Sequence, residues 1–217
     1  MCKPADRSPF LQGLREDARK HRLPISVGVH EPSDYPKSKR MKNTLLWIDE
    51  EGEIAHRYQK LHLFDLDIEG GPVMKESTTI EPGTEILPPF DSPLGKIGSM
   101  ICFDLRFPEI ALDLKRQKAD VLIYPSAFTA ETGKVHWLPL LRARAIECQA
   151  YVVAAAQVGE HNEKRASYGH SIVISPWGEV VAELGSEKKD EPEVLFAEID
   201  LEKLKKVREE MPLVRRT

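Results

Sequence analysis

Three side chains of types that can carry out chemistry stand out in this sequence: Cys102, Lys60 and Glu76. Cys102 ends the apolar run "KIGSMIC", and a Pro-led amphipathic segment begins a few residues later. Because ligand sites in open α/β sheets lie outside the carboxyl ends of strands, this position suits a nucleophile. A thiol with a pKa of about 8.5 is weakly ionised at neutral pH and needs a cation, a base or helix-terminal N–H groups nearby. The alternative is inert packing, because Cys is among the most buried residue types.

Lys60 and Glu76 are candidates for the charged groups around such a thiol. Lys60 stands in "RYQKLHLFD", flanked by apolar residues at the end of an expected strand. An ammonium there could activate a thiol or stabilise an oxyanion. The alternative for Lys60 is a charge that protects an exposed sheet edge. For Glu76, the pattern "VMKES" alone favours a solvated carboxylate in a loop.

Other kinds of catalytic or metal site find little support. No serine stands in a GxSxG elbow, and the spacing of the histidines shows no local pattern typical of a Cys–His pair. Cys2, Cys102 and Cys148 form no CxxC pair, and no His-rich cluster accompanies them, so we expect no metal site. The histidines considered are His30, His56, His62, His136, His161 and His170.

Composition indicates a globular protein without a nucleic-acid or membrane partner. The 217 residues are 41% hydrophobic and 30% charged, enough for one core, so we expect a single domain over residues 1–217. The net charge of -4, with both signs interspersed, excludes a strong basic field. No apolar run reaches the roughly 18 residues that span a bilayer, and "MCKPADRSPF" lacks a signal-peptide core. We expect a soluble protein in a reducing compartment.

The first half of the chain predicts a helix followed by strands. Ser8 as N-cap and Pro9 at the first position begin an amphipathic helix in "SPFLQGLREDARKHR". "PISVGVH" predicts a strand, and "TLLWID" and "IAHRYQKLHL" predict two strands around a Gly-containing turn. Residues 64–95, rich in Gly, Pro and Ser, predict a long excursion of loops.

The second half predicts an α/β fold. The apolar runs "KIGSMIC", "ADVLIYPS" and "AYVVAAAQV" are separated by helical stretches at about 108–118 and 134–149, which indicates buried parallel strands. "HSIVISPWGEVVAELG" predicts a hairpin, and "VLFAEIDLEKLKKVREEMP" a strand that runs into a charged helix. Hairpins on both flanks of a parallel centre predict a mixed sheet.

Seven ordered blocks resemble the nitrilase (carbon–nitrogen hydrolase) superfamily, and more narrowly its amidase branch that includes deaminated glutathione amidase and omega-amidase. They are "YQKLHLFDLDI", "MKES", "CFDLRFPE", "YPSAF", "HWLPLLRARAIE", "YVVAAAQVG" and "RASYGHSIVISPWGEVVAE". The resemblance implies an αββα sandwich with mixed sheets and a cofactor-free Glu-Lys-Cys mechanism that cleaves an amide through a thioester. It makes Cys102 the nucleophile, gives oxyanion stabilisation to Lys60 and the backbone N–H of Phe103, and makes Glu76 the glutamate that orients Lys60.

The sequence departs from the family pattern at its ends. The general-base glutamate that the resemblance implies stands in a "PE" motif after a first strand, and neither Glu16 nor Glu31 has that context. We therefore expect the chain to lack this base, the first strand and helix of the sandwich, and the end of the C-terminal tail. Two interpretations stay open: a fragment of a full amidase, or a chain that has lost hydrolysis and binds a ligand or partner.

Substrate recognition is expected after Cys102. Arg106 could hold a substrate carboxylate, and a salt bridge to Glu109 or another acid is the alternative. The resemblance places Ser126, Phe128 and Trp137 near the pocket, although aromatics there are equally typical of a core. Arg142 and Arg144 favour structural ion pairs.

The resemblance also suggests substrate and assembly. "EKRASYGHS" is closest to the deaminated-glutathione branch, so the expected substrate is deaminated glutathione; an omega-amidase, or a carbamoylase or nitrile hydrolase of the same superfamily, is the alternative. By analogy we expect a homodimer, located in the cytoplasm and also in mitochondria.

Overall fold

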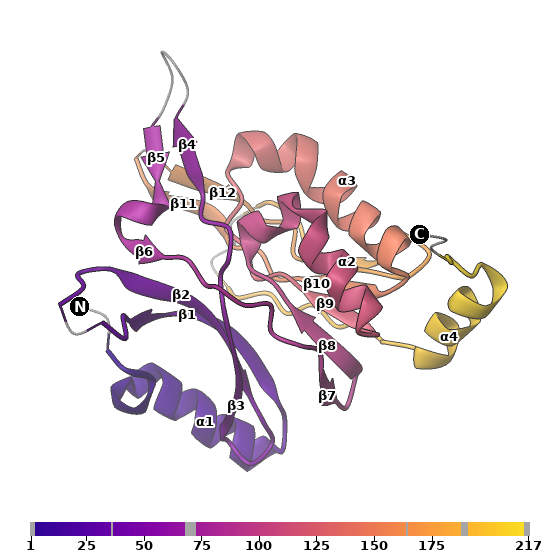
Figure 1. The fold of residues 1–217 in the computed structure, drawn as a ribbon, viewed down its shortest axis with the longest axis horizontal. Coiled ribbons are helices and arrows are strands. Elements are labelled where there is room, and N and C mark those ends of the chain that lie inside the picture. Colours follow the sequence, from indigo (N-terminus) through magenta and orange to yellow (C-terminus); the bar gives the residue numbers. More distant parts are fainter. Residues whose placement is uncertain (1–2, 36, 68–72, 164, 188–190, 215–217) are drawn as a thin grey trace. The chain divides into compact units, whose positions relative to one another are not determined.

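The computed structural model describes residues 3–35, 37–67, 73–163, 165–187 and 191–214 (Figure 1). The chain divides into two compact units, Met1–Leu87 and Pro88–Thr217, and we describe each by itself. The single domain expected over residues 1–217 stays a prediction.

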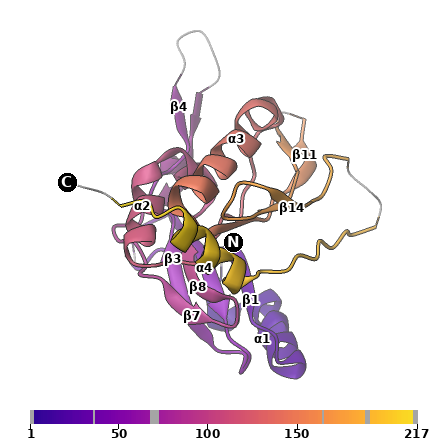
Figure 2. The same ribbon diagram turned by 90° about the vertical axis from the view of Figure 1, so that its right-hand side faces the viewer.

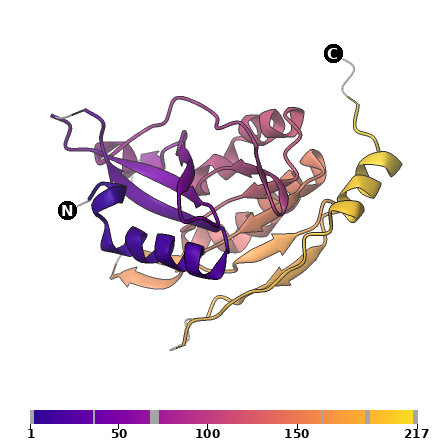
Figure 3. The same cartoon turned by 90° about the horizontal axis from the view of Figure 1, so that it is seen from below.

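A capped amphipathic helix opens the first unit. After the short 3-10 helix η1 (Ala5–Arg7), α1 spans Pro9–His21, as the sequence predicts. The Ser8 Oγ accepts a hydrogen bond from the Leu11 N–H at 3.4 Å, which satisfies one of the donors that a helix start leaves open. The helix buries Leu11 against a small cluster with Ala5 and Leu46, so α1 covers one face of the neighbouring sheet (Figure 3).

The sheet of the first unit is built from three antiparallel strands and one parallel addition. The strands β1 (Ile25–Pro32), β2 (Met41–Ile48) and β3 (Ile54–Gln59) pair in sequence order, and β6 (Ile80–Glu81) pairs parallel with the start of β2. The β2–β3 hairpin turns at Gly52, whose φ of +77° suits glycine. The two strands predicted around this turn are confirmed.

The excursion expected over residues 64–95 is more ordered than the sequence indicated. It holds a two-stranded pair, β4 (Asp65–Asp67) and β5 (Val73–Lys75), followed directly by the 3-10 helix η2 (Glu76–Thr78). The expectation of loops alone is therefore wrong, because strands of three residues are too short to show an alternating pattern.

The second unit is built around a six-stranded mixed sheet, in the order β14-β13-β10-β9-β8-β7. The three central strands, β8 (Gly95–Ser99), β9 (Val121–Ile123) and β10 (Tyr151–Ala154), are parallel, as their apolar sequences predict. The flanks are antiparallel: β7 (Phe90–Ser92) pairs with β8, and β13 (Ile172–Ile174) and β14 (Val180–Glu183) form the other edge. The mixed sheet is confirmed, but the β2–β3 hairpin, expected on one flank, belongs to the other sheet.

Two helices connect the parallel strands. The 3-10 helix η3 (Cys102–Arg106) and α2 (Pro108–Arg116) follow β8, and α3 (Ala130–Cys148) follows β9. α2 and α3 pack against each other, and α3 also contacts β10 (Figure 1). A Cβ on Gly98 of β8 would lie 3.0 Å from a Leu114 side-chain carbon of α2, so the close approach of this helix to the sheet depends on glycine.

The C-terminal region holds a second small hairpin and a last helix. β11 (Val158–Asn162) pairs with β12 (Arg165–Tyr168), and α4 (Leu201–Glu210, yellow in Figure 2) ends the second unit. The strand predicted at residues 194–199 is wrong: no ladder forms there with a described strand, and Val194 and Phe196 are exposed. An apolar alternation alone does not make a strand without a neighbour to bond with.

Candidate active site

Lys60 and Glu76 form a buried ion pair in the first unit. Lys60 follows β3 directly, is 3% exposed, and its Nζ lies 2.6 Å from the Glu76 Oε2. The Glu76 carboxylate also accepts hydrogen bonds from the Phe64 N–H at 2.7 Å and from the Asn43 Nδ2 at 3.2 Å. Lys60 and Glu76 are thus held together in one fixed geometry.

These contacts keep Glu76 ionised. Burial opposes the charged carboxylate, but the Lys60 ammonium and the hydrogen bonds from Lys60, Phe64 and Asn43 outweigh it, so the pKa of Glu76 lies below its usual value. An ionised carboxylate accepts hydrogen bonds and does not donate them. Glu76 can therefore orient a lysine ammonium, and the expectation of a merely solvated loop carboxylate does not describe it.

Two backbone hydrogen bonds fix the position of the Lys60 main chain. Its N–H donates to the Asn43 carbonyl at 2.9 Å, which continues the β2–β3 ladder by one residue, and its carbonyl accepts from the Gly83 N–H at 2.8 Å. A Cβ on Gly83 would lie 2.4 Å from the Gln59 carbonyl oxygen. Glycine is thus required beside Lys60, and the strand end is clamped from two sides.

Cys102 opens a strained turn in the second unit. β8 ends at Ser99, earlier than predicted, and Cys102 is the first residue of η3. Its φ is +45°, a left-handed conformation that is unusual for a residue with a side chain. Its N–H donates to the Pro125 carbonyl, which follows β9, at 3.0 Å. Such strain persists only where the surroundings enforce it, and it is typical of active sites.

The turn after Cys102 carries a guanidinium held by aromatic rings. The Arg106 Cζ lies 5.8 Å from the ring centroid of Phe103 and 5.5 Å from that of Phe128, within the range of cation–π attraction. Its Nη2 lies 3.3 Å from the Nδ1 of His136 on α3. Within the described ranges Arg106 forms no ion pair with an acid, so the salt bridge to Glu109 considered from the sequence is absent there.

The remaining predicted pocket residues are mostly buried. Phe128 packs against Trp137 at 4.8 Å between centroids, and the Trp137 Nε1 donates to the His170 carbonyl at 2.8 Å. Ser126 is 8% exposed, and its hydroxyl donates to the Tyr124 carbonyl at 3.2 Å. Phe128 thus reaches the Arg106 guanidinium with one face, while Ser126 and Trp137 support the segment behind it.

Cys148 shows what an inert thiol looks like in the same unit. It lies at the end of α3 and is 1% exposed. Burial, followed by the nearby Glu147 carboxylate, raises its pKa to about 12, so the thiol stays protonated at neutral pH. Cys102, in contrast, is half-buried, and neither cysteine forms a disulfide. Cys2 lies outside the described residues.

The predicted site residues thus form two groups. Lys60 and Glu76 meet in the first unit, and the second unit brings Phe103, Arg106 and Phe128 together beside the turn of Cys102. The early glutamates lie elsewhere in the first unit: Glu16 is exposed on α1, and Glu31 of β1 lies 3.6 Å from Arg57.

Four contact partners of the site residues were not predicted from the sequence. They are Asn43, Phe64, Pro125 and His136. Asn43 could have been found from the register of the β2–β3 hairpin, which sets it opposite Lys60. Pro125 and Phe64 make their contacts with backbone atoms, so the type of residue at these positions does not reveal them.

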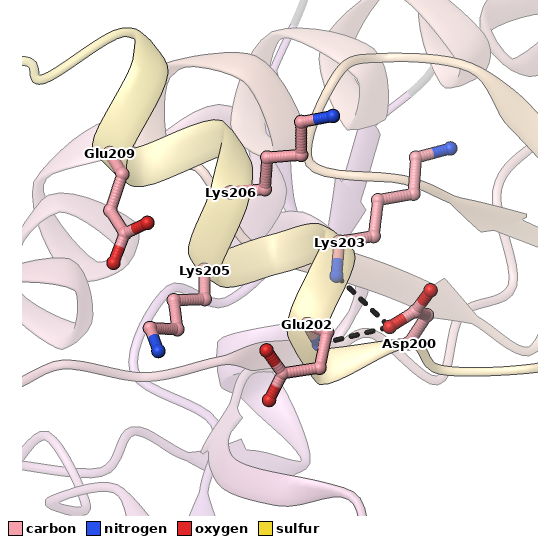
Figure 4. A pocket seen from close by; sticks show the side chains of 6 residues that line it. All are labelled: Asp200, Glu202, Lys203, Lys205, Lys206 and Glu209. Atoms are coloured by element: carbon pink, nitrogen blue, oxygen red, sulfur yellow. Dashed lines mark hydrogen bonds between the residues drawn. The ribbon is translucent and has the colours of Figure 1, made fainter.

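A hollow on α4 does not resemble a catalytic site. It is lined by charged side chains of the helix and its N-cap, where the Asp200 carboxylate caps the Glu202 and Lys203 N–H groups (Figure 4). No cysteine, serine or threonine of the described residues lines it. The lining residues are Asp200, Glu202, Lys203, Lys205, Lys206 and Glu209.

The described part of the chain carries neither a metal-binding cluster nor a membrane-spanning helix. It holds no group of three or more His, Cys, Asp or Glu placed to bind a metal ion. None of its helices is long and apolar enough to cross a membrane.

Comparison with known proteins places the chain in a family. The carbon–nitrogen hydrolase family model matches residues 3–209. "Probable hydrolase nit2" of Schizosaccharomyces pombe is 50% identical over 97% of this chain and 76% of its own length, and "Deaminated glutathione amidase" of Dictyostelium discoideum is 44% identical over 94% and 69%. The chain belongs to the carbon–nitrogen hydrolase family.

A solved structure shows the same fold. The NitFhit protein of Caenorhabditis elegans matches with a TM-score of 0.91 at 46% identity, over 98% of this chain and 51% of that one. This confirms the nitrilase-like α/β fold class expected from the sequence blocks. The chain spans about half of NitFhit and between two thirds and four fifths of the other two relatives.

Proposed function

We propose that the chain is a thiol amidase that hydrolyses a small carboxylated amide through a thioester on Cys102. The observation that carries the proposal is the turn of Cys102, with its positive φ and, four residues later, the Arg106 guanidinium within cation–π distance of two aromatic rings. Family membership and the amidase names of relatives support the reaction class.

The chemistry uses the groups already described. The Cys102 sulfur forms a bond with the amide carbon, and in the mechanism that the family resemblance implies the Lys60 ammonium and the Phe103 N–H stabilise the oxyanion. The C–N bond then breaks, and the amine leaves with the proton that the Cys102 thiol gave up. Water attacks the thioester, the C–S bond breaks, and a carboxylic acid and the thiol are released. Glu76 keeps Lys60 oriented throughout.

Arg106 selects a substrate that carries a carboxylate. Cation–π contacts with Phe103 and Phe128 help to hold the planar guanidinium in place, and its fork of N–H donors matches a carboxylate in two parallel hydrogen bonds. Among the described residues no acid competes for it. A substrate amide with a carboxylate at its other end fits this arrangement, and the buried Ser126 and Trp137 support the segment that carries Phe128.

Deaminated glutathione is the substrate we favour within this class. The relative from Dictyostelium discoideum bears that name. The motif "RASY", which resembles the same branch, lies in β12, and the Tyr168 N–H donates to the Phe128 carbonyl at 2.9 Å. A Cβ on Gly133 of α3 would lie 2.4 Å from the Tyr168 Cβ, so the motif packs tightly against α3. Through Phe128 it also lies close to the Arg106 guanidinium. Lys164, which precedes it, lies outside the described residues.

The test is incubation of the purified chain with deaminated glutathione and detection of the two products by mass spectrometry. In parallel, the mass of the tryptic peptide Ile97–Arg106 reports a thioester on Cys102. We expect an adduct that the Cys102→Ala variant lacks. Arg106→Met should raise KM about tenfold or more for the carboxylated amide, since a bidentate charged contact is lost. The Arg116→Met variant, on the far end of α2, serves as control.

The outcomes separate the proposal from its rivals. Hydrolysis that survives Cys102→Ala contradicts the thiol mechanism. Ligand binding measured by calorimetry, without adduct or products, favours the interpretation that the chain has lost hydrolysis. That interpretation is consistent with Glu16 and Glu31, neither of which fits the base that the resemblance implies. Preference for an amide without the peptide leaving group favours omega-amidase, and turnover of a carbamoyl compound favours a carbamoylase. The homodimer and the cytoplasmic or mitochondrial location stay predictions.

A further inference from the structure

A buried arginine lies behind the turn that carries Cys102. Arg144 of α3 is 5% exposed. Its Nη2 donates to the Leu105 carbonyl of η3 at 2.9 Å, and its Nη1 lies 2.7 Å from the Glu147 Oε1 one helical turn later. The guanidinium therefore links α3 to the segment Cys102–Arg106. The structural ion pair expected for Arg144 is present, but it is only half of what the side chain does.

The other bonds of this turn come from the backbone and from Asp104. The fully buried Asp104 carboxylate accepts from the Ile101 N–H at 3.0 Å, and the Asp104 carbonyl accepts from the Phe107 N–H at 3.0 Å. With the bond from Cys102 to Pro125, these contacts fix the two ends of η3. Arg144 holds its middle, at the carbonyl three residues after the thiol.

Arg144 belongs to a buried polar cluster. Tyr124 of the neighbouring strand end is fully buried, and burial, followed by the nearby acidic groups of Cys148 and Asp104, raises its pKa well above its usual value against the opposing charge of Arg144. Within the described residues the Tyr124 hydroxyl and the Arg144 Nε have no hydrogen-bond partner. Incompletely bonded buried charges are poor devices for stability, because desolvation offsets the attraction. The arrangement suits a geometric role better.

We propose that Arg144 is a positioning residue for the nucleophile. By holding the Leu105 carbonyl, it keeps the turn Cys102–Arg106 in the conformation in which Cys102, its first residue, has left-handed backbone angles. This fixes the direction of the thiol and of the Phe103 N–H that faces the developing oxyanion. The inference rests on the proposed role of Cys102 as nucleophile. A guanidinium suits the task because its rigid fork serves Leu105 and Glu147 together, whereas an ammonium is a single point charge.

The same helix supplies a matched control. Arg142 is exposed, and its Nε donates to the Gly178 carbonyl in the β13–β14 turn at 2.9 Å. It is therefore also an α3 arginine that holds a loop carbonyl, but in a turn that contains no proposed catalytic residue. The structural ion pair expected for Arg142 is absent among the described residues.

The experiment measures the reactivity of Cys102 directly. The full chain is treated with iodoacetamide over a range of pH, and alkylation of the peptide Ile97–Arg106 is followed by mass spectrometry, with the buried Cys148 as internal reference. We expect Arg144→Met to slow alkylation of Cys102 about tenfold or more and to move the midpoint of its pH–rate profile upward, since a misplacement of about 1 Å can cost a hundredfold. Arg144→Lys should recover part of the rate, and Arg142→Met should keep the parent profile.

The result that overturns the proposal is an Arg144→Met variant, folded by circular dichroism, whose alkylation rate and pH profile match the parent. If this variant does not fold, Arg144→Lys and Glu147→Gln decide: slower alkylation supports the proposal, and the parent rate in both overturns it. On the amide substrate, kcat should fall in Arg144→Lys while KM stays within about twofold. Because alkylation needs no amide, failure of the inference is distinguishable from failure of the proposed hydrolysis.

Discussion

At the scale of single residues, the pair of Lys60 and Glu76 shows how a loop carboxylate becomes part of a site. Glu76 satisfies the Lys60 ammonium, a backbone N–H and an amide at once. Each of these partners favours the charged carboxylate over its protonated form. Removing the charge of Glu76 therefore leaves the buried Lys60 ammonium without the ion pair that offsets its loss of hydration.

Replacement of Glu76 by Gln should lower the free energy of unfolding by about 3 kcal/mol at neutral pH, as breaking a buried pair does. Because the pKa of Glu76 is lowered in the folded chain, its contribution is present above the unfolded value of 4.5 and is lost as pH falls through the folded value. The difference between parent and variant should thus shrink in acid. Urea denaturation between about pH 3 and pH 7 measures it.

Glu53→Gln is the matched control for this prediction. Glu53 also pairs with a cation in the first unit, Arg15, but its side chain is 62% exposed. A solvent-exposed pair contributes about 1 kcal/mol or less. Equal losses in the two variants, or a Glu76→Gln difference that grows in acid, would contradict the buried-pair interpretation.

The sequence predicts the identity of these residues better than their geometry. Cys102 stands out in the sequence because it ends the apolar run "KIGSMIC", and Lys60 because it stands at the end of an expected strand. The positive φ of Cys102 is not visible, because it depends on a bond to Pro125, more than twenty residues later. Residue type gives the chemistry, whereas backbone contacts between distant segments give the orientation.

At the scale of elements, α4 illustrates how a charged helix is attached to a sheet. Its apolar contribution is small, with Leu204 and Val207 buried. Arg208 adds three anchors: its guanidinium donates to the carbonyls of Ala119 and Gln149 and pairs with the Asp120 carboxylate at 2.8 Å. Ala119 and Asp120 lie between α2 and β9, and Gln149 directly follows α3, so one side chain joins α4 to two other segments of the unit.

Arg208→Met should therefore destabilise the second unit by about 2 kcal/mol, since hydrogen bonds to a charged group are lost and two carbonyls lose a partner. Lys206→Met on the same helix, whose pair with Glu210 is solvent-exposed, should stay within about 0.5 kcal/mol of the parent. Hydrogen exchange of the α4 amides, with urea midpoints, measures both. A loss no larger for Arg208 than for Lys206 would contradict the anchoring role.

Element prediction succeeded where local patterns are complete. α1 has its cap, its Pro and its apolar stripe in one continuous stretch, and the central strands β9 and β10 are apolar throughout. It failed at residues 194–199, where the strand pattern is present but no described strand pairs with it, and at β4 and β5, which are too short to show a pattern. Pairing is a property of two segments, and one segment cannot reveal it.

At the scale of the whole molecule, buried acids give the stability a dependence on alkaline pH. Burial raises the pKa of Cys148 to about 12, and it raises those of Tyr124 and Tyr151 above their ordinary values. Above the unfolded thiol value of 9.0 the unfolded chain releases protons that the folded chain retains. Stability must then fall as pH rises, because the folded state binds more protons.

Between about pH 8 and pH 10.5 the Cys148 thiol alone should cost about 2 kcal/mol of stability, since each unit above the unfolded pKa is worth about 1.4 kcal/mol. Cys148→Ala should lower stability at pH 8 through lost packing, yet make the decline above pH 9 shallower, because one retained proton is removed. Val152→Ala, a buried and non-titrating position of β10, should lower the whole curve without changing its slope. Urea midpoints across this range measure all three proteins. Parallel curves for the parent and Cys148→Ala would show that the buried thiol does not set the alkaline limit of this fold.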